Sequence, residues 1–406
     1  MQQVSFERLQ QNVVKTLAFG FFQVFLVIMP VVVPFFESRG LSMRDIFTLQ
    51  ALFAFVVLVM EIPSGYVADL LGRKRTLVVG AAFIAAGHSM LLVAHGFAGL
   101  AAFESLLAIG SSLVSGTDLA LIYDSELAMR RDPAHQQRVV ARLYAMHTAG
   151  EAVAGVVASV LVLWSIDATV YAQVLVGWLP LAISLTLDEP PGERLAKGDH
   201  VANLVAIGRH LVKNGAVLRL TLVALSVWSL TTFFAVWLLQ KLWQSQGIEL
   251  KHFGYLWAGY MLVAALAGQF AEPLERRLGS TGLLVLVGVL PVVGYLGLAE
   301  LPAVGGLLAA LAFFVARGLG LVVLRDAFNR RVPSRFRATA NSLTSFGFRG
   351  AFVVTGPFVG WVLDVWGMRT TLELLALASV AIGIGVLLPL ILAVRAARAE
   401  PAPILG

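Results

Sequence analysis

Charged and amide side chains occur deep inside long apolar segments, where they could bind a polar molecule or carry a proton. Glu151, Arg317 and Arg349 fall near the middle of such segments, and Gln23 is a lone amide at mid-depth of the first one. An ionisable side chain at the centre of a bilayer is costly, so it faces a partner or a water-filled cavity. We predict that these residues line a substrate and proton pathway. Alternatively, their charges form a salt bridge with a purely structural role.

Acidic residues also follow one another along the segment 98–126. Glu104 lies near one end of this segment, and Asp118 and Asp124 approach the other end. Fourteen residues separate Glu104 from Asp118, which is nearly four helical turns, so both would lie on one side of a continuous helix. We predict that they belong to the same pathway, with Glu104, Asp118 and Glu151 as candidate proton carriers.

The elements that must position these side chains are twelve apolar segments, each long enough for a helix to cross a bilayer. Hydrophobic residues make up 58% of the 406 residues, and charged residues only 13%, against about 25% in soluble proteins. We therefore predict an all-α membrane protein with twelve transmembrane helices. The segments are 16–36, 46–68, 76–95, 98–126, 138–164, 168–187, 217–242, 251–273, 281–299, 303–327, 338–364 and 369–394.

A polar connector separates the first six segments from the last six. It begins after Leu187 as DEPPGERLAKGDH, whose proline, glycine and charged residues are typical of a linker. We predict an N-terminal half at 1–187, a cytoplasmic linker at 188–216 and a C-terminal half at 217–406. GYVAD at 65–69 recurs as GQFAE at 268–272, with Glu272 in the place of Asp69, which indicates two pseudo-symmetric halves.

The distribution of basic residues predicts the orientation in the membrane. Cytoplasmic loops of membrane proteins are enriched in Lys and Arg. Few of the 30 Lys and Arg residues fall at the predicted outer face, namely Arg39, Arg44, Lys241, Lys251 and Arg369. We therefore predict a multi-pass protein of the cytoplasmic (inner) membrane with both termini in the cytoplasm.

The loop between the second and third segments has the sequence GYVADLLGRKRTL at 65–77. Gly65 and Gly72 would allow close helix packing and a tight turn, Asp69 lies at a helix end, and a basic cluster begins at Arg73. This pattern resembles the signature loop between helices 2 and 3 of the major facilitator superfamily of transporters. The resemblance implies two six-helix halves that work by alternating access. We predict a gating motif made of Gly65, Asp69, Gly72, Arg73, Asp124 and Glu272.

Within this motif we predict that Arg73 pairs with Asp124 and that the pair stabilises the outward-facing state. LVIMPVVVPFF at 26–36 is similar to helix 1 of the drug/proton antiporters of the superfamily. That similarity implies proton-coupled efflux of a small lipophilic or amphipathic compound, with Arg317 as a substrate anchor. The segment 138–164 lacks the Gly-Pro pair of those antiporters, and Glu104 stands where many carry arginine.

Two other activities stay open. One is proton-coupled uptake of an anionic metabolite held by Arg317 and Arg349, and the other is flipping of a lipid or lysolipid. The sequence contains no cysteine, no GxxxxGK[ST] phosphate loop and no HExxH pattern. We predict a non-enzymatic monomer that needs no cofactor, metal or nucleic acid and whose partners are a small-molecule substrate, protons and the bilayer.

Overall fold

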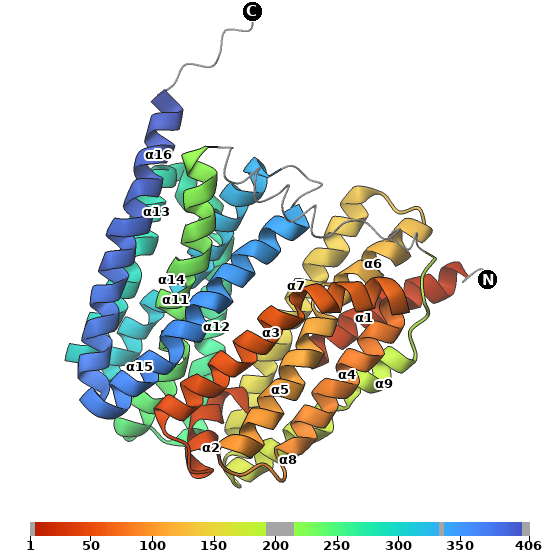
Figure 1. The fold of residues 1–406 in the computed structure, drawn as a ribbon, viewed down its shortest axis with the longest axis horizontal. Coiled ribbons are helices and arrows are strands. Elements are labelled where there is room, and N and C mark those ends of the chain that lie inside the picture. The colour runs from red at the N-terminus through yellow and green to blue at the C-terminus, as the bar shows by residue number, and fades with distance from the viewer. Residues whose placement is uncertain (1–4, 192–214, 333–336, 400–406) are drawn as a thin grey trace, which may run out of the picture. The chain divides into compact units, whose positions relative to one another are not determined.

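The computed structural model describes residues 5–191, 215–332 and 337–399, and these residues form helices joined by short turns, without strands (Figure 1). Seven helical stretches of the described chain are long and apolar enough to cross a membrane. The remaining predicted spans, 16–36, 76–95, 138–164 and 251–273, also coincide with helices. The prediction of an all-α membrane protein is confirmed.

Contacts between residues divide the chain into two compact units. Unit 1 consists of residues 1–198 and 247–261, and unit 2 of residues 199–246 and 262–406. The predicted halves at 1–187 and 217–406 stay a prediction, and most of the predicted linker at 188–216 lies outside the described residues.

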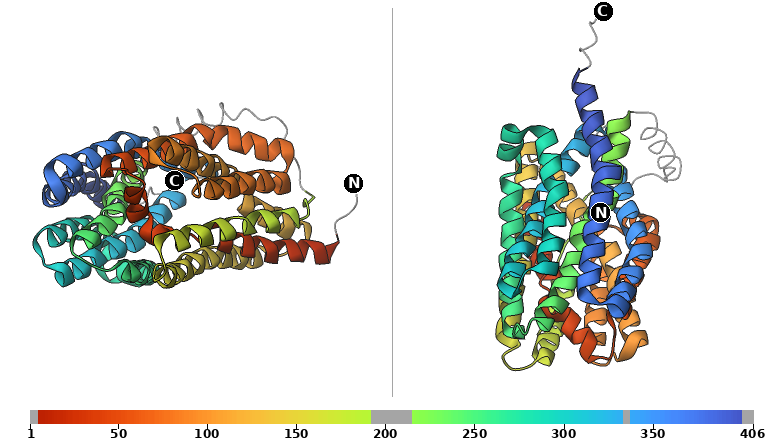
Figure 2. Two further views of the ribbon diagram at one scale, coloured as in Figure 1. Left: turned by 90° about the horizontal axis from the view of Figure 1, so that it is seen from below. Right: turned by 90° about the vertical axis from the view of Figure 1, so that its left-hand side faces the viewer.

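Unit 1 is built from helices whose ends follow local sequence signals. Ser42 and Asp45 form a capping box at the start of α3, and Asp132 caps α7, accepting the His135 amide at 2.7 Å. Helices α4 and α5 run side by side (Figures 1 and 2). The elements are α1 Phe6–Gln23, η1 Met29–Val31, α2 Val32–Ser38, α3 Met43–Leu71, α4 Arg73–Met90, α5 Gly96–Val114, α6 Thr117–Ala128, α7 Pro133–Leu161, α8 Ile166–Gly177, α9 Leu179–Leu185 and η2 Leu250–His252.

Two predicted spans of unit 1 are interrupted. The first breaks after Gln23 and resumes at Met29, beside Pro30, whose missing N–H prevents a continuous hydrogen-bond ladder. The span 98–126 breaks between α5 and α6, where Gly116 has a φ of +78°. Glu104 and Asp118 therefore lie on two different helices, and the prediction of a continuous helix with one acidic side is wrong.

Unit 2 contains α11 Ala216–Ser245, α13 Ala271–Glu300, α14 Ala303–Arg331, α15 Arg337–Ile382, η4 Gly383–Leu387 and α16 Leu388–Ala399, and α12 Phe253–Gln269 begins in unit 1 and ends in unit 2. Gly367, with a φ of +81°, breaks α15 into two parts. The first part matches the predicted span 338–364, and the second part together with η4 and α16 covers the predicted span 369–394. Helices α13 and α14 lie side by side (Figure 2). Their buried apolar side chains form one cluster with those of α11, which includes Trp228.

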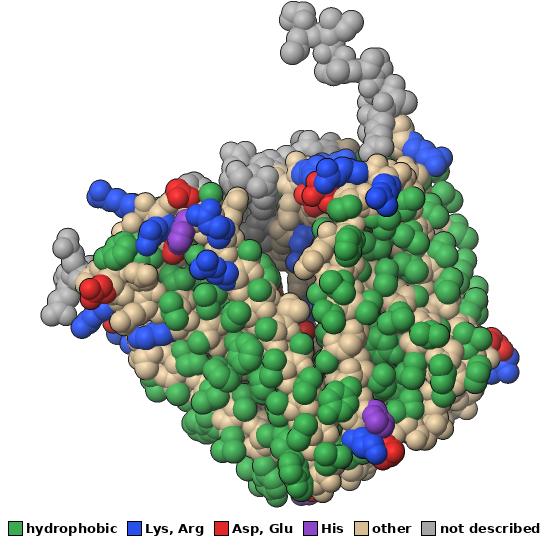
Figure 3. All heavy atoms as spheres, turned by 180° about the vertical axis from the view of Figure 1, so that it is seen from behind, with side chains coloured by type: hydrophobic (Ala, Val, Ile, Leu, Met, Phe, Trp, Pro, Cys, Tyr) green, Lys and Arg blue, Asp and Glu red, His purple; other side chains and the backbone are tan. Residues whose placement is uncertain are grey.

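The surface of each unit has the polarity that a bilayer requires. Large apolar side chains are exposed along the helix sides, whereas Lys and Arg side chains gather toward the helix ends (Figure 3). Hydrocarbon chains solvate such apolar faces as well as a protein core would, so their exposure costs little in a membrane.

Candidate substrate pocket and gating motif

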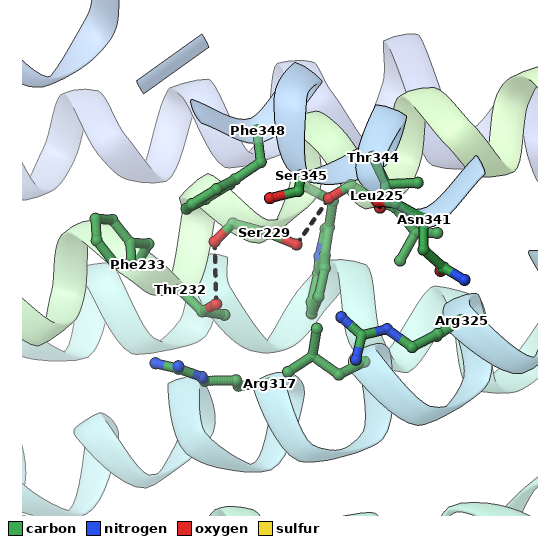
Figure 4. Close-up of a pocket in the computed structure, with 12 residues that line it drawn as sticks. Leu225, Ser229, Thr232, Phe233, Arg317, Arg325, Asn341, Thr344, Ser345 and Phe348 are labelled. Atoms are coloured by element: carbon green, nitrogen blue, oxygen red, sulfur yellow. Dashed lines mark hydrogen bonds between the residues drawn. The ribbon is translucent and has the colours of Figure 1, made fainter. Parts of the chain in front are cut away.

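A pocket of about 320 Å³ lies in unit 2 between α11, α14 and α15 (Figure 4). Two arginines, Arg317 and Arg325, enter it from α14, and hydroxyl and amide groups enter it from the other two helices. Its lining is Leu225, Trp228, Ser229, Thr232, Phe233, Arg317, Leu321, Arg325, Asn341, Thr344, Ser345 and Phe348.

Helix spacing and one glycine position the arginines. Arg317, Leu321 and Arg325 follow one another at intervals of four residues, so they share one face of α14. Gly320 lets α14 approach the Trp228 ring, because a Cβ there would lie 2.2 Å from the indole. The Trp228 indole is fixed in turn, since its Nε1 donates to the Val287 carbonyl at 3.3 Å.

The hydroxyl groups of the lining already have partners. Ser229 donates to the Leu225 carbonyl at 2.9 Å, and Thr344 donates to the Asn341 carbonyl at 2.7 Å. No carboxylate is among the described residues that line the pocket. The charge of the lining is therefore positive, and guanidinium groups bind carboxylates and phosphates well because they offer several donors in a planar fork.

Two of the predicted pathway residues lie in or beside this pocket. Arg317 lines it, and Arg349 adjoins it, because the Arg349 Nε donates to the lining residue Ser345 at 3.3 Å. Arg325 was not predicted as a site residue. Its spacing of eight residues from Arg317, two full turns on one helix, was the signal in the sequence that could have identified it.

The predicted acidic pathway residues lie in unit 1. Glu104 is buried on α5, and the Gln50 amide of α3 donates to its Oε1 at 2.6 Å. An amide can bond to a carboxylate through its N–H and to a carboxylic acid through its oxygen, so this partner is compatible with a gain or loss of a proton. Asp118 is buried in the first turn of α6 and accepts the Leu119 amide at 2.7 Å, whereas Glu151 is half-buried on α7.

Gln23 is the last residue of α1, beside the break in the first span. Its Oε1 is buried and accepts no hydrogen bond from the part of the chain that the structure describes. An amide oxygen of this kind inside a membrane protein can accept a hydrogen bond from a ligand or a water molecule. The prediction that Gln23 contacts the substrate pathway stays a prediction.

The gating motif has the predicted ion pair. Arg73 Nε lies 3.3 Å from Asp124 Oδ2, as the sequence predicted. Gly72 has a φ of +91° between α3 and α4, which confirms the predicted turn. At Gly65, by contrast, a Cβ would meet none of the described residues within 4 Å, and the predicted close packing at Gly65 stays a prediction.

The structure describes the side chain of only one of the two remaining acidic residues of the motif, Asp69 and Glu272. The side chain of Asp69 lies outside the described part of α3. Glu272 is exposed in the first turn of α13, and its carboxylate lies 3.2 Å from Arg276 on the same helix. The gating roles of all six residues of the motif, Gly65, Asp69, Gly72, Arg73, Asp124 and Glu272, stay predictions.

Glu189 is a member of this site that the sequence did not reveal. Its carboxylate accepts the backbone amides of Arg73 at 2.7 Å and Lys74 at 2.9 Å, where Gly72 offers no side chain to cap α4. Next to it, the Asp188 amide donates to Asn12 at 2.9 Å, which ties the same segment to α1. The start of the predicted linker is thus fixed to the signature loop.

Glu126 and His135 form a second pair near the end of α6. Glu126 is buried, and its Oε2 lies 3.4 Å from His135 Nε2 on α7. Glu126 was not among the predicted site residues.

Membrane-spanning helices that bury ionisable side chains and line a polar pocket are typical of helical membrane transporters. The chain belongs to the Major Facilitator Superfamily, whose sequence pattern matches residues 16–348. An uncharacterised MFS-type transporter of Burkholderia pseudomallei (strain 1106a) is 26% identical over 349 residues, which cover 82% of this chain and 80% of the relative.

Solved structures share the fold. The nucleoside transporter NupG is similar with a TM-score of 0.76 at 14% identity, over 93% of this chain and 98% of that chain. A bacterial homologue of the human lysosomal transporter Spinster gives 0.76 at 14% identity, over 98% and 100%. A D-xylose–proton symporter gives 0.67 at 13% identity, over 91% and 96%. At such identities the likeness establishes the fold of a secondary transporter and not a substrate.

Proposed function

We propose that this secondary transporter carries a small organic anion, in exchange or symport with protons. The observation that carries the proposal is the pocket of unit 2, into which Arg317 and Arg325 place two positive charges. Of the three activities open at the sequence level, transport of an anion fits this lining best. Efflux of a lipophilic cation fits it less well, because two guanidinium groups repel a positive charge.

The residues that line the pocket also offer groups that would hold the anion. An anion at Arg317 can accept hydrogen bonds from the guanidinium, while the aromatic rings of Trp228 and Phe233 border the remainder of the molecule. Few charges and a largely aromatic or aliphatic wall are typical of pockets for small organic molecules. A carboxylate or phosphate on a small carbon skeleton is therefore the proposed substrate class.

Proton coupling is assigned in this proposal to Glu104, with Asp118 and Glu151 as further carriers. Glu104 is buried in a membrane-spanning helix and hydrogen-bonded to the neutral side chain of Gln50. Intramembrane carboxyl groups of this kind mark proton relays in transporters. One of the compared structures is named as a proton symporter, which agrees with such coupling.

The predicted organisation belongs to the same proposal. Residues 1–187 and 217–406 would form two halves that rock about the substrate, with both termini in the cytoplasm and the chain in the inner membrane as a monomer. The Arg73–Asp124 pair would be closed in the outward-facing state and open in the inward-facing one. Its observed separation of 3.3 Å supports the pairing on which this gating depends.

The test is binding to the purified protein in lipid nanodiscs. Benzoate and phenyl phosphate would be compared with benzyl alcohol and benzylamine, which match them in size but are neutral or cationic. Removing a charged hydrogen-bond donor costs about 1.5–3 kcal/mol, so Arg317→Gln is expected to weaken anion binding about ten- to hundredfold. Arg276→Gln is the control, because Arg276 is exposed on α13 and pairs with Glu272. Preference for benzylamine, or equal effects of both variants, would refute anion transport.

Proton coupling is tested separately in proteoliposomes with a pH-sensitive dye. Glu104→Gln keeps a group that can bond to Gln50 but cannot carry a proton. We expect it to bind the anion and to lose substrate-dependent proton movement. Glu300→Gln is the control, because Glu300 is exposed and pairs with Arg369 at 2.6 Å. Proton movement that persists in Glu104→Gln would exclude Glu104 as the carrier.

A further inference from the structure

A second pocket lies on the other side of α11. It has a volume of about 320 Å³ and is enclosed by α11 and by the parts of α15 before and after Gly367. It is lined by Val227, Leu230, Thr231, Phe234, Ala351, Thr355, Phe358, Val359, Val362, Thr371, Leu374, Leu375, Ala378, Ser379 and Ile382. No charged residue is among these described lining residues.

The hydroxyl groups of this second pocket do not make it polar. Each of the four donates to a carbonyl three or four residues earlier on its own helix, so its hydrogen is used within the helix. The bonds are Thr231 to Trp228 at 2.7 Å, Thr355 to Ala351 at 2.8 Å, Thr371 to Gly367 at 2.8 Å, and Ser379 to Leu375 at 2.7 Å. What remains for a ligand is an apolar wall, which suits an alkyl chain.

The two pockets meet at one cluster of phenylalanines. On α11, residues of the first pocket such as Trp228 and Thr232 and residues of the second such as Leu230 and Phe234 fall on opposite faces, at about 100° per residue. Between these faces, the ring of Phe352 from α15 lies 5.7 Å from the ring of Phe234.

The other side of Phe352 faces the first pocket. Its ring lies 4.9 Å from Phe233, and Phe233 lies 5.3 Å from Phe348, both in edge-to-face geometry. Phe233 and Phe348 line the first pocket, as Figure 4 shows. Phe352 itself is 2% exposed, and its ring contacts Phe233 of the charged pocket and Phe234 of the apolar pocket, so it lies between residues of the two pockets.

We propose that the transported anion is an amphiphile, whose charged head binds at Arg317 and whose alkyl chain passes the phenylalanine cluster into the apolar pocket. This inference rests on the proposed function and adds to it a specificity-determining residue, Phe352. The head is matched by the positive charge of one pocket, and the chain by the apolar wall of the adjoining pocket. In this proposal, a change of the Phe352 side chain to another rotamer would join the two pockets.

The experiment measures binding of butyl, octyl and dodecyl phosphate, below their micelle concentrations, to the protein in nanodiscs. Each buried methylene is expected to add about fourfold to the affinity. Ala378→Phe and Ala351→Phe fill the apolar pocket and should abolish this gain. Val354→Phe is the matched control, because Val354 lies on α15 with 74% of its surface exposed and does not line the pocket. Phe352→Ala should increase the rate of dodecyl phosphate binding.

The outcomes separate this inference from the proposed function. If all three phosphates fail to bind, or bind equally well to Arg317→Gln, the anion pocket itself is refuted. If butyl phosphate binding depends on Arg317 but the chain-length gain survives in Ala378→Phe and Ala351→Phe, the chain partitions into bulk lipid and the amphiphile inference is overturned. A thermal unfolding midpoint for each variant identifies any that fail to fold, and either of the two pocket-filling variants suffices for the test.

Discussion

The cap that Glu189 forms on α4 yields a quantitative prediction. Its carboxylate is the acceptor for the first two amides of that helix, Arg73 and Lys74, at 2.7 and 2.9 Å. A side-chain cap contributes about 0.5–2 kcal/mol to a helix. A negative charge at a helix N-terminus adds about 0.3–1 kcal/mol at an exposed site. Glu189→Ala is therefore expected to destabilise the first turn of α4 by about 1–2 kcal/mol, which corresponds to about a five- to thirtyfold change in its opening equilibrium.

Hydrogen–deuterium exchange of the protein in nanodiscs measures this opening, in the peptide that covers residues 72–77. Exchange there should accelerate by the predicted factor in Glu189→Ala, and by less in Glu189→Gln, which keeps an acceptor oxygen but loses the charge. Asp326→Ala is the control, because that carboxylate is outside the gating motif and lies 2.8 Å from Arg330 one turn along the same helix. Such a pair contributes about 0.2–0.5 kcal/mol. Unchanged exchange in Glu189→Ala, or an equal increase at 72–77 in Asp326→Ala, would refute the capping argument.

Three further predictions concern the loops at the helix ends. Gly72→Ala should destabilise the folded protein by about 1–3 kcal/mol and so lower its thermal unfolding midpoint, since Gly72 has a φ of +91° and a ψ of 166°. Gly65→Ala should stabilise it by about 0.5–1 kcal/mol and so raise the midpoint, because the added Cβ meets none of the described residues within 4 Å. In a double-mutant cycle, Arg73→Ala and Asp124→Ala should be non-additive by about 0.2–1 kcal/mol, and strict additivity would exclude a stabilising pair. At the start of α7, the hydrogen bond that Asp132 accepts from the backbone amide of His135 lowers the pKa of the Asp132 carboxyl. The contribution of this carboxylate to the stability of the folded protein is therefore present above the ordinary Asp pKa and is lost as the pH falls through the lowered value. The unfolding midpoint of Asp132→Asn should therefore fall less on acidification than that of the unchanged protein, and parallel curves would contradict this.

Patterns within short stretches predicted most of the fold. Apolar runs of the length of a bilayer gave the helices, because a membrane forces every backbone amide into a helix of that length. The signature loop gave the turn at Gly72 and, with the position of Asp124, the ion pair with Arg73. Each of these features depends on a few residues close together at a helix end, namely a glycine that allows the turn and charged side chains beside it.

Other expectations failed because a local irregularity is invisible in hydropathy. The break at Gly116 separates Glu104 from Asp118, since a φ of +78° ends one helix and begins another within an unbroken apolar run.

The sequence by itself determined that this protein is a helical membrane transporter with charged side chains inside its spans, because the bilayer restricts both backbone and side-chain polarity so strongly. Only the tertiary structure decided which of those charges meet. Arg317 and Arg325 share a pocket with Ser345, and Glu189 caps a helix more than a hundred residues before it in the chain. Those neighbours depend on the rotation and register of each helix against the next, which are fixed by packing between residues far apart in the sequence.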